Sequence, residues 1–299
     1  MNGLSEQPQA RVSNNRLYLQ HGPISLIVEA VAEATSDTDE VTLAYRQATI
    51  AFKTVLEQLS SELTLLRKPV SSERPTGSIA RSMHKTAMRY EDRFVTPMVA
   101  VAGAVADHIL TCAVEGRELL RASVNNGGDI ALYAGHNSCY EIGICAHMET
   151  GQLAGSIKIT SNDRVRGIAT SGWRGRSFSF GIADAVTVLA TDAVTADAAA
   201  TIIANEVTVD SSGCIRRVPA SELLPDSDLG QRLVTVAVDN LPMNLVHRAL
   251  QRGTRYADQL VRDGLIISAF LCLDNVVRTV GTATAPKLRQ LHEDTPVAL

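Results

Sequence analysis

This sequence of 299 residues lacks several features that would assign it to a class at once. Its five cysteines are odd in number and form no Cys-x-x-Cys pair, which argues against a disulfide framework and a zinc site. Its histidines form no His-Glu-x-x-His motif. No stretch approaches about 18 uninterrupted apolar residues, and the polar N-terminus has no apolar signal core. We therefore expect reduced thiols, no membrane partner and a cytoplasmic location.

An excess of positive charge is also missing, since the net charge is −4. This balance argues against broad electrostatic binding to nucleic acid or anionic lipid. The apolar fraction of 45% and the charged fraction of 20% are typical of a soluble globular protein. No internal repeat, low-complexity linker or break in composition interrupts the chain. We expect a flexible N-terminus (1–15), a single domain (16–282) and a C-terminal tail (283–299), with a small molecule as ligand.

The apolar patterns predict an α+β fold, with mixed sheets and packed helices. Two strands flank the turn His21-Gly22-Pro23, and an amphipathic helix of about 25 residues ends near Pro69. The later elements are predicted in this order: a buried helix with a small-residue face (97–114), short strands (118–169), a strand (186–191), a helix that Thr195 caps (195–207), a polar loop (208–230), a strand, a helix (245–266) and further strands. The small face at 97–110 and the apolar segment 260–273 suit either a homodimer interface or a buried core.

A turn of Asn125, Asn126, Gly127, Gly128 and Asp129 separates two apolar runs. Paired glycines permit positive φ, so the chain can turn sharply and present backbone N–H groups. Asparagine supplies a donor and an acceptor, and Asp129 supplies a carboxylate for general acid–base chemistry. From the residue types alone, this stretch is either a hairpin whose side chains satisfy the local backbone or the rim of a pocket.

A second polar stretch, 167–181, contains a Thr-Ser-Gly turn at 170–172. The sole tryptophan, Trp173, stands beside Arg174 and Arg176. An aromatic ring and guanidinium groups suit stacking on a planar ring and binding of a phosphate or carboxylate. A solvated turn in which Trp173 covers apolar surface explains the same residues, so both interpretations stay open.

Asp197 and Thr201 are four residues apart in the predicted helix 195–207, so their side chains lie on one face. Both are hard oxygen ligands of the kind that Mg²⁺ takes. As an isolated pattern this pair is weak, because any alanine-rich helix can carry Asp and Thr at this spacing.

Five segments, taken in order, resemble the ApbE superfamily. The best-known members of that superfamily are Mg²⁺-dependent FAD:protein FMN transferases. The wording is most similar to an uncharacterised side branch, and the resemblance covers residues 16–282. The segments are AGAVAD (102–107), VNNGGDI (124–130), GIATSG (167–172), VTVLA (186–190) and ADAAAT (196–201).

The resemblance implies an ApbE-like fold with Mg²⁺ on Asp197 and Thr201. It also implies that 127–129 and the Thr-Ser turn line the ligand pocket. Combined with the residue chemistry, it predicts one pocket in which Asp129 and Asp184 carry acid–base catalysis. The predicted binding residues are Asn125, Asn126, Gly127, Gly128, Thr170, Ser171, Trp173, Arg174 and Arg176.

The sequence departs from the transferase pattern at two places. The helix containing AGAVADHIL has no lysine, and SFSFGIADAV has Asp184 but neither the histidine nor the Asp-Pro element. These absences argue against FAD as a cofactor and favour an enzyme that hydrolyses or rearranges a small anionic or flavin-like molecule. Superfamily precedent favours Mg²⁺-dependent transfer of FMN from FAD to a protein. A non-catalytic small-molecule-binding protein and a purely structural role for the motifs remain as alternatives.

Overall fold

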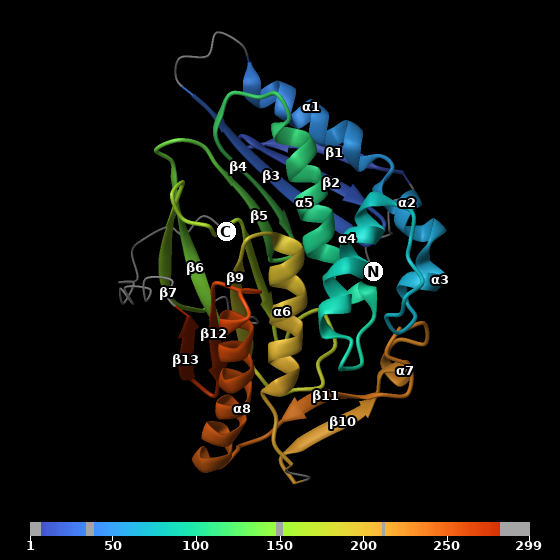
Figure 1. Cartoon of the computed structure of the whole chain (residues 1–299), viewed down its shortest axis with the longest axis vertical. Helices are drawn as coiled ribbons and strands as arrows, with labels where there is room; N and C mark the ends of the chain where they lie inside the picture. The colour runs from blue at the N-terminus through green and yellow to red at the C-terminus, as the bar shows by residue number, and fades with distance from the viewer. Residues whose placement is uncertain (1–6, 34–38, 148–151, 211–212, 282–299) are drawn as a thin grey trace. The chain divides into compact units, whose positions relative to one another are not determined.

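A computed structural model of the chain describes residues 7–33, 39–147, 152–210 and 213–281 (Figure 1). The chain divides into two compact units. The first unit comprises residues 1–139, 160–169 and 191–198, and the second comprises 140–159, 170–190 and 199–299. Strand β8 (Gly167–Ser171) and helix α6 (Ala193–Glu206) each begin in the first unit and end in the second. Whether the whole chain folds as one domain stays a prediction.

The first unit is built on antiparallel strands in the order β1-β2-β3-β4-β5, and the start of β8 pairs with β5. The bounds are β1 (Gln9–Ser13), β2 (Arg16–His21), β3 (Ile24–Ala32), β4 (Leu119–Asn126) and β5 (Asp129–Ala134). The predicted strands around His21-Gly22-Pro23 are therefore confirmed. Strand β1 lies inside the segment expected to be a flexible N-terminus. Its side chains are mostly exposed, so its backbone pairing with β2 leaves no apolar pattern in the sequence.

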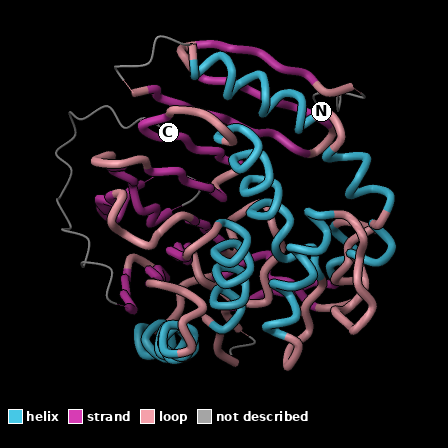
Figure 2. Tube along the Cα trace, turned by 45° about the horizontal axis from the view of Figure 1, so that its top comes forward, coloured by secondary structure: helices cyan, strands magenta, loops and turns pink. Residues whose placement is uncertain are grey.

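Alternate residues of this sheet are buried on the face that the helices cover, as Leu17, Leu19, Leu26 and Val28 show. Helix α1 (Glu40–Phe52) packs against β3 and α5 (Val101–Val114) against β4 and β5, and Figure 2 shows both helices alongside the strands. Burial of these apolar faces is the main favourable contribution to the stability of the unit.

The prediction of a single helix of about 25 residues is wrong, because the structure has three helices in this segment. These are α1, α2 (Val55–Ser61) and α3 (Leu63–Leu66). Apolar spacing continues across both breaks, so periodicity alone does not locate them. At the second break the Glu62 carboxylate accepts hydrogen bonds from the amides of Thr76 and Gly77, just before α4 (Ser78–Ala87).

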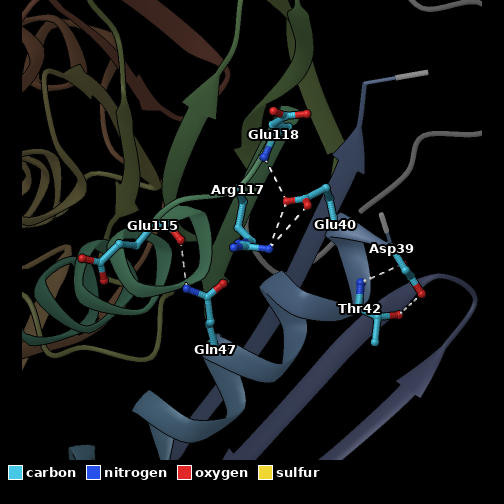
Figure 3. Close-up of polar contacts among 7 residues, drawn as sticks. All are labelled: Asp39, Glu40, Thr42, Gln47, Glu115, Arg117 and Glu118. Atoms are coloured by element: carbon cyan, nitrogen blue, oxygen red, sulfur yellow. Dashed lines mark hydrogen bonds and ion pairs between the residues drawn. The ribbon is translucent and has the colours of Figure 1, made fainter. Parts of the chain in front are cut away.

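A buried ion pair ties the start of α1 to the connection between α5 and β4 (Figure 3). Arg117 Nη1 lies 3.3 Å from Glu40 Oε2, and the Glu118 amide donates to the same oxygen at 3.0 Å. The Glu40 side chain is only 8% exposed. Loss of one partner would leave a buried charge uncompensated, which makes such pairs costly to break.

The second unit contains a β-hairpin, a two-stranded ribbon and a long helix. Strand β9 (Ala185–Ala190) pairs with β12 (Ser268–Leu273), which forms the hairpin with β13 (Val276–Gly281), and α8 (Met243–Arg262) packs on β12 and β13. Strands β10 (Ile215–Pro219) and β11 (Leu233–Val238) form the ribbon, with α7 (Ala220–Leu223) after β10. Another two-stranded sheet joins β6 (Cys139–His147) and β7 (Gln152–Thr160).

The predicted polar loop 208–230 is wrong in part, because it contains β10 and α7. The sequence of β10, IRRVP, has no clear alternation, and its pairing with β11 is a tertiary effect. The predicted tail (283–299) lies outside the described residues. With antiparallel sheets and packed helices in both units, the predicted α+β class is confirmed.

Among the described residues, Pro97–Val114 is long and apolar enough to cross a membrane, and half of it is buried inside the protein. It comprises a short 3₁₀ turn, Pro97–Ala100, followed by α5. A core helix of a soluble protein has the same composition. Its small-residue face packs within the first unit, and in the other candidate segment, 260–273, Ser268–Leu273 is buried throughout, so the protein's own packing accounts for these parts of the two candidate dimer segments. A homodimer stays a prediction.

Asp192, which precedes α6, and Ala193, the first residue of α6, lie against two glycines of the first unit. A Cβ at Gly103 would lie 2.3 Å from the Ala193 carbonyl oxygen, and one at Gly167 would lie 2.0 Å from the Asp192 carbonyl carbon. Both distances are well below van der Waals contact. Glycine is therefore required at both positions, because the backbone at the start of α6 comes too close to leave room for a side chain.

We predict that Gly103→Ala lowers the free energy of unfolding by about 2 kcal/mol, because the added methyl group forces α5 and the start of α6 apart. Urea unfolding followed by circular dichroism measures this change. Gly213→Ala is the matched control, since a Cβ there meets open space among the described residues, and its effect should stay within about 0.5 kcal/mol. Equal effects of the two substitutions would contradict the close approach.

Candidate functional site

The Asn-Asn-Gly-Gly-Asp stretch is a tight hairpin turn in the first unit. Gly127 and Gly128 have φ of 67° and 112°, and Asn126 pairs with Asp129 across the turn. Asn125 Oδ1 accepts the Gly128 amide at 2.8 Å, so the hairpin interpretation is confirmed. A further role of this turn in ligand binding stays a prediction.

The same turn is also tied to the start of α5. Asn126 Nδ2 donates to the Ala102 carbonyl oxygen at 3.1 Å. Asp129, the predicted acid–base residue, is half-buried at the first position of β5. The two asparagines thus hold the turn in place, and Asp129 follows directly from it.

The N-terminal amides of α6 are satisfied by two carboxylates of the first unit. Asp107 on α5 accepts the amides of Ala193 and Val194 at 3.0 and 2.8 Å, and Asp192 accepts the Thr195 amide at 2.8 Å. Asp192 is therefore the N-cap, and the prediction that Thr195 caps the helix is wrong. Aspartate directly before the helix is the signal that would have identified it. For Asp107 the helix periodicity holds no such signal.

Asp197 makes the reverse connection, from α6 back to α5. Its Oδ2 accepts the Gly103 amide at 2.9 Å, and the Ala102 amide also stabilises its charge. Burial raises the pKa of Asp197, and repulsion from Asp107 adds to the increase. The predicted Mg²⁺ ligand therefore uses one carboxylate oxygen to cap a helix.

Thr201, the other predicted metal ligand, belongs to the second unit, because the division passes through α6 between the two residues. Its hydroxyl donates to Ser171 Oγ at 3.3 Å. The described residues contain no cluster of three or more His, Cys, Asp or Glu side chains that could hold a metal ion. Asp197 and Thr201 match the oxygen chemistry of Mg²⁺, an ion that often keeps several waters and binds ligand phosphates. Binding of Mg²⁺ stays a prediction.

The second unit brings together Trp173, Arg174 and Asp184. Asp184 Oδ1 accepts hydrogen bonds from Trp173 Nε1 at 3.3 Å and from Arg174 Nε at 3.1 Å, and Oδ2 accepts the Asp274 amide at 2.7 Å. The Arg174 guanidinium lies over the indole ring, 4.3 Å from its centroid. Sequence reasoning placed these three residues in one site without finding the connection to Asp274.

Two further features shape the same segment of the second unit. Gly172 lies against the segment that leads into β9, and a Cβ there would be 2.5 Å from the Asp184 carbonyl oxygen. The Thr170 hydroxyl is bonded to that of Thr187 at 2.9 Å. Arg176 is exposed. A close backbone approach therefore explains the last glycine of GIATSG.

The predicted site residues fall into two groups, each described within its own unit. Asn125, Asn126, Gly127, Gly128, Asp129 and Asp197 belong to the first unit. Thr170, Ser171, Trp173, Arg174, Arg176, Asp184 and Thr201 belong to the second. That both groups line one pocket stays a prediction.

The capping carboxylate Asp107 leads to a prediction about pH. Burial raises its pKa from 3.8 to about 6, although the amides of Ala193 and Val194 oppose the increase. Because the folded state binds this proton more tightly than the unfolded state, its contribution to stability is complete below pH 3.8 and is lost as pH rises through about 6.

We predict that the melting temperature of the wild type falls more steeply over this pH range than that of Asp107→Asn, which cannot ionise. Differential scanning fluorimetry in buffers of constant ionic strength measures the two slopes. The variant also loses part of the cap, which lowers its stability at every pH. Parallel slopes would show that Asp107 titrates normally in the folded protein.

Comparison with known proteins gives one broad match and several partial ones. The model of the family described as AbpE bacteria matches residues 9–282. The UPF0280 protein of Methanothrix thermoacetophila is 31% identical over 191 residues, which cover 62% of this chain and 77% of that protein. The UPF0280 protein of Methanospirillum hungatei is 37% identical over 125 residues, covering 42% and 50% respectively. The chain thus spans about half the length of this second relative.

Among solved structures, the flavin transferase ApbE from Vibrio cholerae covers 92% of this chain and 97% of its own, with 14% identity and a TM-score of 0.48. The apo flavinyl transferase ApbE of Pseudomonas stutzeri has 12% identity and a TM-score of 0.45, over 93% of this chain and 96% of its own. Likeness at this level carries no functional argument. The family match covers most of the chain and confirms the resemblance to an uncharacterised ApbE-like branch. The chain belongs to the AbpE bacteria family.

Proposed function

We propose that this protein is a cytoplasmic ApbE-like enzyme that binds and transforms a small anionic or flavin-like molecule. The observation that supports it most is the stacked pair of Trp173 and Arg174 in the second unit. Asp184 accepts a hydrogen bond from each of them. The pair comes just after the end of β8, where Thr170 and Ser171 carry hydroxyl groups. Aromatic, cationic and hydroxyl groups thus follow one another within a few residues of chain.

The chemistry of these groups indicates the ligand class. An indole ring binds planar rings by stacking, and a guanidinium attracts phosphate or carboxylate. The hydroxyls of Thr170 and Ser171 donate and accept hydrogen bonds, which suits the polar edge of a heterocycle. A planar ring that carries an anionic group satisfies all three kinds of side chain.

The reaction we assign to this ligand is a hydrolysis or rearrangement in which Asp129 moves the proton. Asp129 is half-buried and directly follows the Gly127-Gly128 turn. A carboxylate in that position accepts a proton from water or from the ligand and returns it to the leaving atom. Asp129 is the residue for which substitution should separate binding from turnover.

A second candidate is Mg²⁺-dependent transfer of FMN from FAD to a protein. Family membership supports it, as does the buried carboxylate of Asp197 on α6, four residues from Thr201. In that case these two residues would hold Mg²⁺, which neutralises charge on a transferring phosphate. The residues of the chain would bind and orient the flavin.

We predict that FMN and FAD bind the wild type and that Trp173→Leu weakens binding about tenfold, since stacking on the indole is lost. Quenching of flavin fluorescence measures the affinity. Tyr18→Leu is the matched control, because Arg11 covers the Tyr18 ring in the first unit at 5.5 Å as Arg174 covers Trp173. No binding of either flavin at tens of micromolar would rule out the transferase and leave a non-flavin anion as ligand.

Magnesium and Asp129 separate the remaining alternatives. Loss of FAD binding when EDTA removes Mg²⁺ would favour the transferase over the enzyme that hydrolyses or rearranges its ligand. Mass spectrometry of small molecules released from denatured protein identifies a co-purified ligand to assay for turnover. We expect Asp129→Asn to abolish turnover of that ligand while its affinity changes less than about threefold. Unchanged turnover would exclude Asp129 as the acid–base residue, and no turnover by the wild type would indicate a binding protein.

A further inference from the structure

The carboxylate of Asp184 is surrounded by donors that come from two separate parts of the second unit. Trp173 and Arg174 belong to the loop after β8, and Asp274 belongs to the turn between β12 and β13. The Asp184 side chain is only 7% exposed, and that of Arg174 is 30% exposed. One buried carboxylate therefore joins the loop 172–176 to the hairpin turn.

The turn that supplies the third donor has the regular geometry of a tight hairpin. Asp274 and Asn275 have φ of 49° and 62° between paired strands, which is the geometry of a two-residue hairpin. The backbone amide of Asp184 also donates to the Cys272 carbonyl oxygen at 3.0 Å, and the backbone amide of Trp173 donates to the Ala183 carbonyl oxygen at 3.0 Å. The hairpin thus provides a fixed point to which the loop is tied.

These contacts are unlike those expected of a general base. A base needs an oxygen directed at the proton of the ligand, whereas both oxygens of Asp184 accept hydrogen bonds from the protein. One of these bonds is an ion pair with Arg174. Charge-assisted bonds of this kind are strong and fix geometry.

We infer that Asp184 is a positioning residue, which holds the Trp173–Arg174 pair in its ligand-binding geometry by tying it to the β12–β13 turn. The inference rests on the proposed function insofar as the loop contacts the ligand. Asp184 acts through the indole ring and the guanidinium and exchanges no proton with the ligand. This replaces the catalytic role that the sequence suggests for Asp184.

The sole tryptophan of the chain makes the inference testable without any ligand, because Trp173 fluorescence reports on this loop alone. Asp184→Asn is the informative variant. The side chain of asparagine has one acceptor oxygen and one NH₂ group, where aspartate has two acceptor oxygens. In this variant the NH₂ group must therefore face either the backbone N–H of Asp274 or the N–H donors of the loop, and hydrogen bonds are lost on that side. The loop should loosen while the hairpin and the surrounding sheet stay folded.

We expect the acrylamide quenching constant of Trp173 to rise about twofold or more in Asp184→Asn, with a red-shifted emission maximum, since local opening exposes the ring. Asp163→Asn is the matched control, because that carboxylate holds a different turn by accepting from the Thr160 amide and hydroxyl. It should leave Trp173 quenching unchanged. Both measurements use the full chain, with circular dichroism to establish that each variant is folded.

A lower melting temperature in Asp184→Asn with unchanged Trp173 quenching would overturn the inference, since Asp184 would then serve stability alone. If Asp184→Asn fails to fold, Arg174→Gln removes the ion pair from the loop side and should give the same rise in quenching. No rise in that folded variant would equally overturn the inference. Because no flavin is present, these outcomes are independent of those that test the proposed function.

For a co-purified ligand that the wild type turns over, a positioning role and a catalytic role of Asp184 predict different changes in KM and kcat. We expect Asp184→Asn to raise KM about tenfold and to reduce kcat much less, because a displaced loop weakens binding. A loss confined to kcat, with KM unchanged, would assign Asp184 to the chemical step instead.

Discussion

The reciprocal capping of α5 and α6 is the interaction on which the first unit depends. Asp107 of α5 accepts the first two amides of α6, and Asp197 of α6 accepts an amide in the first turn of α5. Helix N-termini carry unsatisfied amides and a partial positive charge, so each carboxylate offsets the charge of the other helix. The two helices are thereby fixed at their starts, where the small residues meet.

This arrangement explains two glycines of the segments shared with the family, Gly103 and Gly167. Gly103 and Gly167 lie against the backbone at Asp192 and Ala193, so the start of α6 comes closer to α5 and β8 than any side chain would permit. Burying these carboxylates has an electrostatic cost, because loss of hydration is the main cause of the raised pKa values of Asp107 and Asp197, and repulsion from neighbouring carboxylates adds to it. Backbone amides reduce that cost without adding a cationic side chain.

The second unit uses a carboxylate in a comparable way. Asp184 joins a loop to a hairpin turn, and Gly172 lets the loop backbone lie directly against the backbone of Ala183 and Asp184, just before β9. In both units, aspartates that looked chemically reactive in the sequence bind backbone amides of the protein. The asparagines beside Asp129 are used in the same way, since their side chains bond to backbone groups and hold the hairpin turn.

Much of the architecture could be predicted because it depends on local patterns. The α+β class, the strands around Gly22, the Gly-Gly hairpin and the helix at 97–114 all follow from residue periodicity and turn chemistry. The breaks after α1 and α2 could not be predicted, since apolar spacing runs through them. Strands β1 and β10 were missed because their pairing leaves no alternation in their own sequences.

By itself, the sequence determined the fold class, the family resemblance and which segments carry chemically capable side chains. These properties depend on residue type and on spacing over a few residues, and both can be read from the sequence without knowledge of the fold. Only the tertiary structure decided how the carboxylates are used. Asp107, Asp184 and Asp197 each accept from a backbone amide that lies 86, 90 and 94 residues away, respectively, and only folding brings such distant amides within hydrogen-bond distance.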